Sequence, residues 1–190
     1  MSAARLRPAA SGDHRLYARF FAELGMSEGP LDRKRWSAEC APTSVFLERG
    51  RSAIGYAFWN GDGSDVHVRH VVVDRAVRGQ GHGRVLMLEL AKLLLARGAR
   101  NWRLNVLTSN TAAIGLYSGL GFEKVYETVV LRLETRNVPR LPESLARARE
   151  AGADSDALHE QRFDLLDGHL ARARGYKGVR VLEARLADGA

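Results

Sequence analysis

Cysteine is nearly absent from this chain. Cys40 is the single cysteine among 190 residues, so no disulfide can form within the chain. A lone cysteine is typical of proteins that work in a reducing compartment. We therefore expect a cytoplasmic protein.

Long apolar runs are also missing. The first eight residues contain no apolar core of signal-peptide length. The longest apolar stretch, residues 85–96, is interrupted by Glu89 and Lys92 and is too short to cross a bilayer. The sequence therefore predicts no membrane partner.

The positive charge lacks the clustering that nucleic-acid binding requires. The formal net charge is +7, yet no block of five basic residues occurs and aromatic residues are not interleaved with the arginines. Residues 137–190 carry nine basic and nine acidic residues, so the whole excess belongs to residues 1–136. We expect no nucleic-acid partner, and a basic domain suits an anionic cofactor.

Two familiar phosphate-binding motifs are absent as well. The P-loop string of Gly, four residues and Gly-Lys-Ser/Thr does not occur. The dinucleotide fingerprint Gly-x-Gly-x-x-Gly fails because Arg84 stands where its last glycine belongs. The strand expected after the next helix also lacks the acidic residue that would hold a ribose.

Residues 71–84 nevertheless form an anion-binding pattern. Three valines end in a charged turn, glycines then recur at every second position, and an apolar helix follows. Backbone N–H groups at a helix start attract phosphate, and glycine, which has no Cβ, lets it come close. Arg78 and Arg84 stand at the two ends of the loop. We therefore expect a pyrophosphate to bind here.

The elements around this loop predict one mixed α/β domain in residues 1–136. Hydrophobic periodicity and turn residues place strands at 4–8, 43–49, 52–60, 65–74, 101–107 and 124–134, and helices at 13–24, 31–39 and 84–97. A further helix lies between Asn110, its expected N-cap, and Gly119.

Residues 137–190 form a C-terminal extension with a different pattern. Helices are expected at 142–151 and 156–174, and a strand at 177–185. This order is similar to that at the start of the first domain, so we interpret the extension as a truncated or vestigial second copy of such a domain. A strand that pairs with the main sheet or with another subunit explains it equally well. Its apolar residues predict docking on the first domain or on a second subunit, as in a homodimer.

Two motifs resemble those of the GNAT superfamily of N-acetyltransferases. Arg-Gly-x-Gly-x-Gly occurs at 78–83, and Asn-x-x-Ala-x-x-Leu-Tyr-x-x-Leu-Gly-Phe occurs at 110–122. One expected helix and one expected strand separate them. The resemblance covers residues 5–134. It implies the GNAT α/β fold with splayed central strands, and acetyl-CoA-dependent transfer to a primary amine.

The resemblance also implies roles for individual residues. The backbone of Val71, Val72 and Val73 would pair with the pantetheine arm of acetyl-CoA. Asn110 would contact the same arm, and Tyr117 would protonate the leaving thiolate. The pyrophosphate would lie on Arg78, Gly79, Gln80, Gly81, His82, Gly83 and Arg84. No metal site is expected.

The general base is not identified by the resemblance. Several family members carry a glutamate where this chain has Asn105, whose amide cannot usefully accept a proton. Others carry one on the central strand, where this chain has His67, and histidine titrates near neutrality. His70 is a second candidate, on the opposite face if the strand alternates regularly. A histidine without a role, or a deprotonated amine that needs no base, fits the sequence as well.

Competing functions remain open at this point. The leading one is an N-acetyltransferase that acts on a small-molecule or peptide amine. The alternative is a catalytically weak CoA-binding or regulatory module. The amide at Asn105 favours this alternative, and the presence of Tyr117 argues against it. A nucleic-acid binder is the third hypothesis. The acceptor amine cannot be deduced, because the loops that select it vary freely on one fold.

Overall fold

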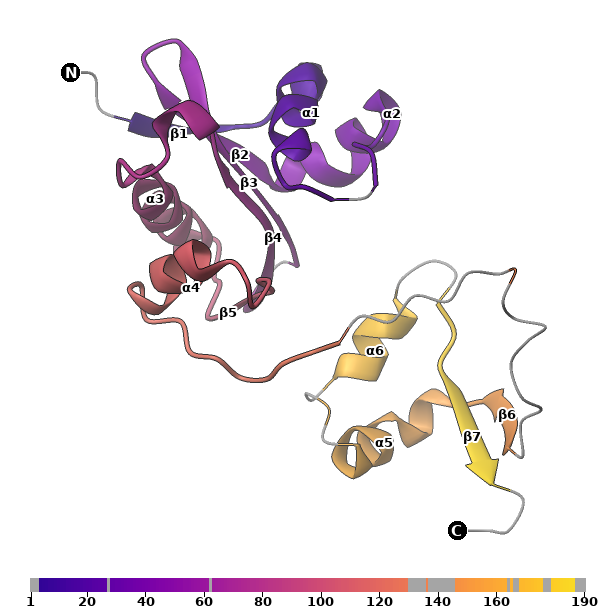
Figure 1. Cartoon of the computed structure of the whole chain (residues 1–190). Coiled ribbons are helices and arrows are strands. Elements are labelled where there is room, and N and C mark those ends of the chain that lie inside the picture. The colour runs from indigo at the N-terminus through magenta and orange to yellow at the C-terminus, as the bar shows by residue number, and fades with distance from the viewer. Residues whose placement is uncertain are drawn as a thin grey trace. The chain divides into compact units, whose positions relative to one another are not determined.

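The chain folds into two compact units, Met1–Glu127 and Thr128–Ala190, in a computed structural model. The structure describes residues 4–26, 28–61, 63–129, 136, 146–163, 165, 168–175 and 179–186, without the side chains of 146, 147, 185 and 186. Each unit has its own sheet (Figure 1).

Unit 1 is built on a five-stranded sheet in the order β1-β2-β3-β4-β5. The strands are β1 (Ala4–Pro8), β2 (Ser44–Arg49), β3 (Ser52–Asn60), β4 (Asp65–Val73) and β5 (Asn101–Leu104). The first four pair antiparallel, and β5 runs parallel to β4. The helices are α1 (His14–Ala22), α2 (Arg33–Arg35), α3 (His82–Ala96) and α4 (Thr111–Ser118).

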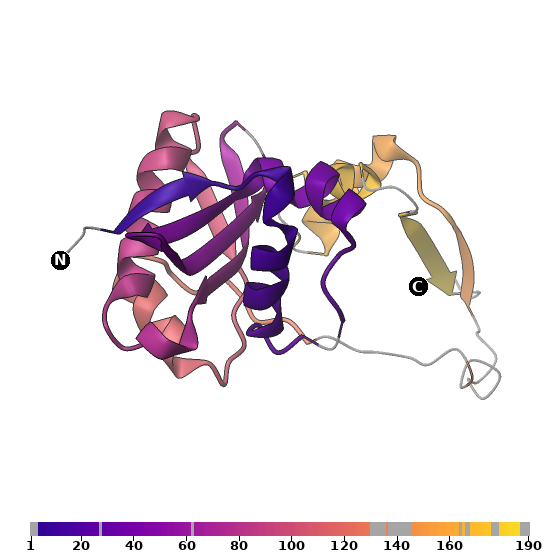
Figure 2. The ribbon, with the colours of Figure 1, turned by 90° about the horizontal axis from the view of Figure 1, so that it is seen from above.

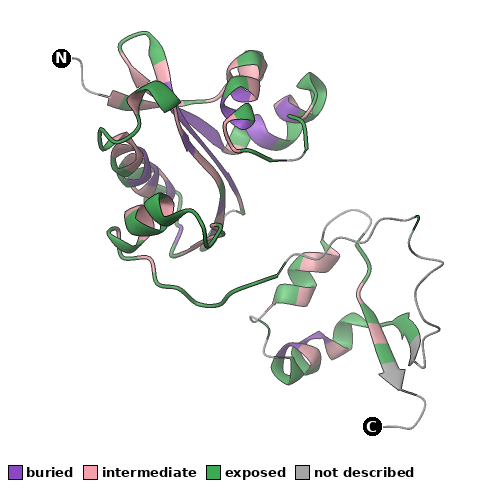
Figure 3. Cartoon of the chain, viewed as in Figure 1, coloured by how far each residue is buried: buried purple, intermediate pink, exposed green. Residues whose placement is uncertain are grey.

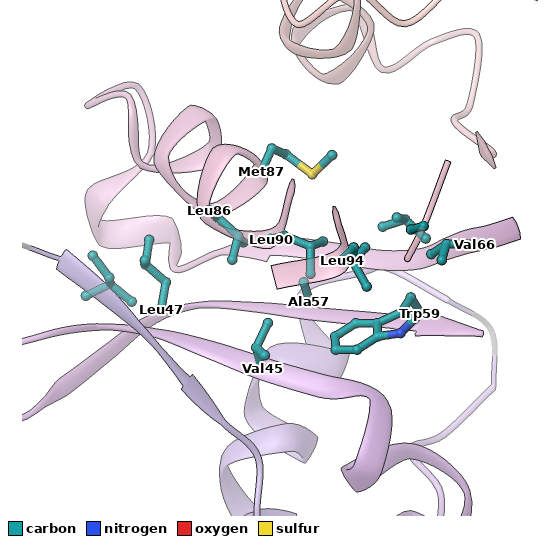
Figure 4. Close-up of a cluster of buried hydrophobic side chains, with 12 residues drawn as sticks. Val45, Leu47, Ala57, Trp59, Val66, Leu86, Met87, Leu90 and Leu94 are labelled. Carbon is teal, nitrogen blue, oxygen red and sulfur yellow. The ribbon is translucent and has the colours of Figure 1, made fainter. Parts of the chain in front are cut away.

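Two apolar clusters cover the two faces of this sheet. On one face, Leu86, Leu90 and Leu94 of α3 point at the strands and contact residues such as Val45 and Leu47 (Figure 4). The spacing of four residues puts all three leucines on one side of the helix. α1 packs on the other face, so the sheet lies between α1 and α3 (Figure 2).

Most of the buried aromatic residues of unit 1 gather on the α1 face. Phe20 of α1 lies 6.0 Å from Phe46 of β2, measured between ring centroids. Tyr17 stacks on Trp36 at 4.4 Å. Cys40 is buried in the same cluster, and burial raises the pKa of its thiol to about 11. The thiol is therefore protonated at neutral pH and is a poor nucleophile.

β4 is longer than its partner β5, and this difference opens the sheet. The two strands pair from Asp65 opposite Asn101 to Val68 opposite Leu104, and there the ladder ends. β4 continues for five more residues to Val73, still paired with β3 on its other side. Within the described part of the chain, no strand occupies this edge of β4 after Val68.

Unit 2 contains a two-stranded antiparallel sheet and two short helices. The elements are β6 (Ala146–Glu150), α5 (Asp156–Arg162), α6 (His169–Arg174) and β7 (Leu182–Leu186). Buried Glu160 of α5 accepts hydrogen bonds from the backbone N–H of Gly168 and of Leu170, both at 2.7 Å. Arg174 of α6 pairs with Asp156 at 2.8 Å. Charged contacts therefore hold the two helices together.

Most elements agree with the predictions, and five do not. The single helix predicted at 156–174 forms as two helices, α5 and α6, and the strand predicted at 177–185 begins only at Leu182. The strand predicted at 101–107 ends at Leu104. No strand forms at 124–129, and the rest of the predicted strand at 124–134 lies outside the described residues. The helix predicted at 142–151 is wrong, because residues 146–150 form β6; residues 142–145 lie outside the described residues.

None of the described helices has the length and apolar character needed to span a bilayer.

Candidate active site

A cleft of about 240 Å³ lies beside the carboxyl end of β4. Its walls come from the end of β4, the loop before α3, the first turn of α3 and one face of α4. The lining residues are Val71, Val73, Val77, Arg78, Gly79, Gly81, His82, Gly83, Ala112, Ala113, Leu116 and Tyr117.

The backbone of β4 points into this cleft at two valines. The N–H of Asp74 donates to Ile54 O on β3 at 2.9 Å. Because backbone groups alternate between the two edges of a strand, Val72 also faces β3, whereas Val71 and Val73 face the open edge. Of the three valines predicted to pair with pantetheine, Val71 and Val73 line the cleft, and Val72 is buried on the α1 face.

The glycine loop leaves its backbone uncovered at the start of α3. Gly79 and Gly81 have φ of 75° and 80°, a left-handed conformation that favours glycine. A Cβ built on either residue would have no atom within 4 Å, so the space in front of the loop is open. Gly81 is the N-cap of α3, where N–H groups have no partner within the helix. The loop therefore has the geometry that an anionic group requires.

Gly83 has a different reason to be glycine. A Cβ at this position would lie 3.1 Å from Cδ2 of Leu116 on α4. The absence of a side chain therefore lets α4 approach α3 closely. This contact brings Tyr117 to the cleft that the loop also lines.

The two arginines at the ends of the loop bind other parts of the protein. Arg78 donates from Nη2 to Glu23 Oε2 at 2.6 Å and from Nε to Val73 O at 2.9 Å. Glu23 also accepts from the backbone N–H of Arg75 at 3.2 Å. Arg84 donates to Gly119 O at 3.0 Å, just beyond α4. Both guanidinium groups thus brace the cleft, and only Arg78 lines it.

Helix α4 presents Tyr117 to the cleft. Asn110 caps this helix by accepting a hydrogen bond at Oδ1 from the N–H of Ala113 at 3.1 Å, as predicted. The ring of Tyr117 lies 5.8 Å from that of Phe122, and burial raises the pKa of its phenol. A raised pKa keeps the proton on the hydroxyl at neutral pH. Gln80 and Asn110 belong to the loop and to the cap but do not line the cleft.

The two candidate histidines lie on the same face of β4, contrary to the prediction from regular alternation. Facing residues of neighbouring strands share a face. His67 faces Asn60 and His70 faces Phe58, and these β3 residues are two apart. A register shift between Phe58 and Trp59 accounts for the difference, because an inserted residue reverses the alternation beyond it.

The surroundings of the two histidines differ. His67 lies where β4 is paired on both sides, and burial, with Arg69 and Arg103 nearby, lowers its pKa. His70 lies beyond the end of β5, against Phe58 at 5.3 Å and Phe21 at 5.6 Å. Burial, with a smaller effect of Arg69, lowers the pKa of His70 to about 4. Its Nδ1 is buried without a hydrogen-bond partner.

Sequence reasoning missed several residues that line the cleft or brace it. Glu23 lies 55 positions before Arg78, and no local pattern links the two. Ala112, Ala113 and Leu116 carried a signal, since Ala113 is one helical turn before Tyr117 and shares its face. Among the described residues, no group of His, Cys, Asp and Glu has the arrangement of a metal site.

A family model described as "Acetyltransferase (GNAT) family" matches residues 14–122, more than half of the chain. Among curated proteins, a thialysine N-epsilon-acetyltransferase from Sus scrofa is 25% identical over 150 residues, which cover 67% of this chain and 88% of that protein. The enzyme of the same name from Mus musculus is 33% identical over 73 residues, or 38% of this chain and 42% of that protein.

Solved structures share the fold of unit 1. An aminoglycoside N-acetyltransferase, AAC(6')-Iy, in complex with CoA superposes with a TM-score of 0.59 at 18% identity, covering 70% of this chain and 96% of that chain. A ribosomal-protein-alanine N-acetyltransferase from Brucella melitensis biovar Abortus 2308 gives 0.55 at 15% identity, covering 69% and 100%.

Proposed function

Since the chain belongs to the GNAT acetyltransferase family, we propose that unit 1 transfers an acetyl group from acetyl-CoA to a primary amine. The acceptor is a small molecule or a peptide whose amine attacks the thioester directly. One observation carries the proposal: the open edge of β4 and the uncovered glycine loop meet in a single cleft that also contains Tyr117.

The cleft suits two parts of acetyl-CoA, its pyrophosphate and its pantetheine arm. The N–H groups around Gly79 and Gly81 suit the pyrophosphate, because an added Cβ meets nothing there and the helix dipole is positive. The edge of β4 at Val71 and Val73 suits the amides of the pantetheine arm, as a further strand would. When bound, acetyl-CoA supplies an activated acetyl group and a thiolate leaving group.

Tyr117 acts as the general acid in this proposal. Its hydroxyl keeps its proton at neutral pH because burial raises the pKa of the phenol. A thiol has an ordinary pKa of about 8.5, so proton transfer from the phenol is favourable only while the thiolate forms beside it. Ala113 and Leu116 of the same helix line the cleft together with Tyr117.

His70 is better placed than His67 to accept the proton of the amine. It lies in the part of β4 that continues beyond the end of β5, whereas His67 lies in the closed part of the sheet; the ring of His70 packs against Phe21 on the α1 face and does not line the cleft. The lowered pKa of His70 keeps the ring neutral at working pH but makes it a weak base, and its buried Nδ1 has no hydrogen-bond partner among the described residues. Turnover measured for His70→Phe and His67→Phe separates the two: the first loses activity, and the second retains most of it.

The alternative function is a catalytically weak CoA-binding or regulatory module. It is favoured by the lining of the cleft, which among the described residues contains no carboxylate. Asn105, where several relatives of this fold carry a glutamate, is exposed and lies beyond the end of β5. Tyr117 argues for catalysis, because a binding module needs no acid for a thiolate.

An amine panel with acetyl-CoA tests the proposal. Release of free CoA is followed with thialysine, an aminoglycoside and a peptide with N-terminal alanine, since proteins named for these acceptors resemble this chain, and with lysine as the natural analogue of thialysine. We expect release above the hydrolysis rate with at least one amine. Acetyl-CoA binding without transfer to any amine supports the module instead, and absence of binding contradicts both functions.

A further inference from the structure

The turn between β4 and the glycine loop, residues 74–78, is mostly exposed. Val77 packs against the apolar cluster under α3, whereas Arg75, Ala76 and Arg78 are exposed. Figure 3 shows this turn largely in the exposed colour. In the proposed function, one acetyl-CoA has to reach both the edge of β4 and the glycine loop. Because few apolar contacts fix the turn between them, polar contacts must do so.

Hydrogen bonds within the turn hold its first part. The Oδ1 of Asp74 accepts from the N–H of Ala76 at 3.0 Å, and the N–H of Val77 donates to Asp74 O at the same distance. The bond from the N–H of Arg78 to Arg75 O is longer, 3.4 Å. The turn is therefore held less firmly by its own groups where it enters the glycine loop.

Helix α1 contacts the turn with two charged side chains. Arg19 and Glu23 are four residues apart, so they lie on the same side of the helix. Arg19 donates to Ala53 O on β3 at 2.8 Å, and its Nη2 lies 3.5 Å from Oδ2 of Asp74. Glu23, the C-cap residue of α1, reaches Arg78 at the other end of the turn. The two side chains thus contact both ends of the turn.

Glu23 also connects the glycine loop to the end of β4. Its Oε2 accepts from the N–H of Arg75 at 3.2 Å and from Nη2 of Arg78 at 2.6 Å. The same guanidinium donates from Nε to Val73 O at 2.9 Å. Val73 and Arg78 both line the cleft. One carboxylate therefore orients the arginine that joins the two parts of the site.

The charge of Glu23 does not itself favour a pyrophosphate. A carboxylate beside an anion site is unfavourable, because like charges repel. Here the negative charge is opposed by Arg78, whose Nη2 lies 2.6 Å from Oε2 of Glu23. The pair adds little net attraction for a phosphate group. Its contribution to binding is therefore the conformation that it gives to the turn.

We propose that Glu23 is a positioning residue for acetyl-CoA, which acts through Arg78 to hold the glycine loop and the open edge of β4 in the arrangement that binds the cofactor. The inference rests on the proposed function, because it takes acetyl-CoA as the ligand of this cleft. Without the carboxylate, the turn would become ordered only when acetyl-CoA binds. The conformational entropy lost at that moment lowers the affinity.

Two substitutions at Glu23 test its role by calorimetry with acetyl-CoA and the full-length protein. Glu23→Ala removes both hydrogen bonds and should raise the dissociation constant roughly tenfold, because the turn is no longer ordered in advance. Glu23→Gln keeps an oxygen that can accept from Arg75 and Arg78. It should bind acetyl-CoA at least about threefold more tightly than Glu23→Ala does, because the bonds matter more than the charge.

The Arg7–Glu48 pair offers a matched control. Its Nε–Oε1 distance is also 2.6 Å, and the side chain of Glu48 is 16% exposed, compared with 23% for Glu23. This pair joins β1 to β2, and neither residue lines the cleft. Glu48→Ala should therefore bind acetyl-CoA with the affinity of the wild type.

A double-mutant cycle shows whether Glu23 acts through Arg78. In an Arg78→Ala background, Glu23→Ala should raise the dissociation constant by no more than about threefold, because the residue that it orients is gone. The full tenfold effect in that background would overturn the proposal.

The remaining outcomes separate this inference from the proposed function. Unchanged affinity of Glu23→Ala, failure of Glu23→Gln to improve on it, or equal weakening in Glu48→Ala overturns the inference and leaves the proposed function standing. Tighter binding by Glu23→Ala also overturns it, because Glu23 would then be keeping Arg78 away from the pyrophosphate. If the wild type does not bind acetyl-CoA, the proposed function and the inference both fail.

Discussion

At the residue scale, Tyr117 is the side chain whose chemistry the proposed reaction uses most directly. Replacing it by phenylalanine removes one hydroxyl from a ring that otherwise lines the cleft and packs near Phe122. We expect Tyr117→Phe to bind acetyl-CoA with unchanged affinity and to turn over roughly 100-fold more slowly, as for loss of a general acid. Steady-state kinetics with calorimetry separate the two quantities. Equal losses of affinity and rate would assign Tyr117 a packing role.

His70 predicts how stability depends on pH. In the unfolded chain a histidine takes up a proton near pH 6.5, whereas in the folded protein His70 does so only at about pH 4. The unfolded state therefore binds more protons within this window, and stability falls as pH decreases from 6.5 towards 4. His67, whose pKa is also lowered, acts in the same direction.

The variant His70→Phe tests this linkage. Phenylalanine fits among Phe21, Tyr56 and Phe58 and does not titrate. The decrease in melting temperature from pH 7 to pH 4.5 should be smaller in the variant than in the wild type. Part of the decrease should persist, because His67 still titrates in the variant. Melting curves that shift in parallel at every pH would contradict the prediction.

At the scale of elements, the sequence predicted what local periodicity controls. The alternation in β2, β3 and β4 and the spacing of leucines in α3 are local, and these elements lie close to their predicted places. The predictions of a strand at 124–129 and of a helix at 146–150 were wrong. Strand formation depends on pairing with a neighbouring strand, which no local pattern reveals. The prediction also missed the irregular pairing between β3 and β4, because it assumed regular alternation along β4.

The residues of the site also divide into those set by local motifs and those set by tertiary contacts. The glycine loop, the cap by Asn110 and the place of Tyr117 follow from motifs within a few residues, and the sequence identified them. The partners of Arg78 and Arg84 did not follow, because Glu23 and Gly119 reach them through the tertiary fold. Sequence therefore located the cleft but not the bonds that brace it.

The loop and α3 give a test with an internal control. Gly81 and Gly98 flank α3, both have positive φ, and an added Cβ meets nothing at either. Gly81→Asp and Gly98→Asp therefore carry similar backbone strain, about 1 to 2 kcal/mol each. Only the first places a carboxylate where the pyrophosphate would bind.

We expect calorimetry to show that Gly81→Asp no longer binds acetyl-CoA, whereas Gly98→Asp binds it as the wild type does. Both proteins should still unfold cooperatively. Equal affinity of Gly81→Asp and the wild type would remove the loop from the site, and equal weakening of the two variants would point to strain alone.

At the scale of the whole molecule, every residue that lines the cleft belongs to unit 1. A chain ending at Arg136 should therefore keep its affinity for acetyl-CoA. The apolar residues of the extension predict that the same deletion lowers the melting temperature or changes the oligomeric state, measured by light scattering. An unchanged melting temperature together with an unchanged number of subunits would show that the extension docks on nothing.

Titration of the intact protein with acetyl-CoA tests the central claim most directly. The account predicts saturable binding of one acetyl-CoA per chain, displaced by CoA and weakened by salt because the loop attracts a charged pyrophosphate. The absence of saturable binding, or binding that CoA does not displace, would contradict the assignment of this cleft.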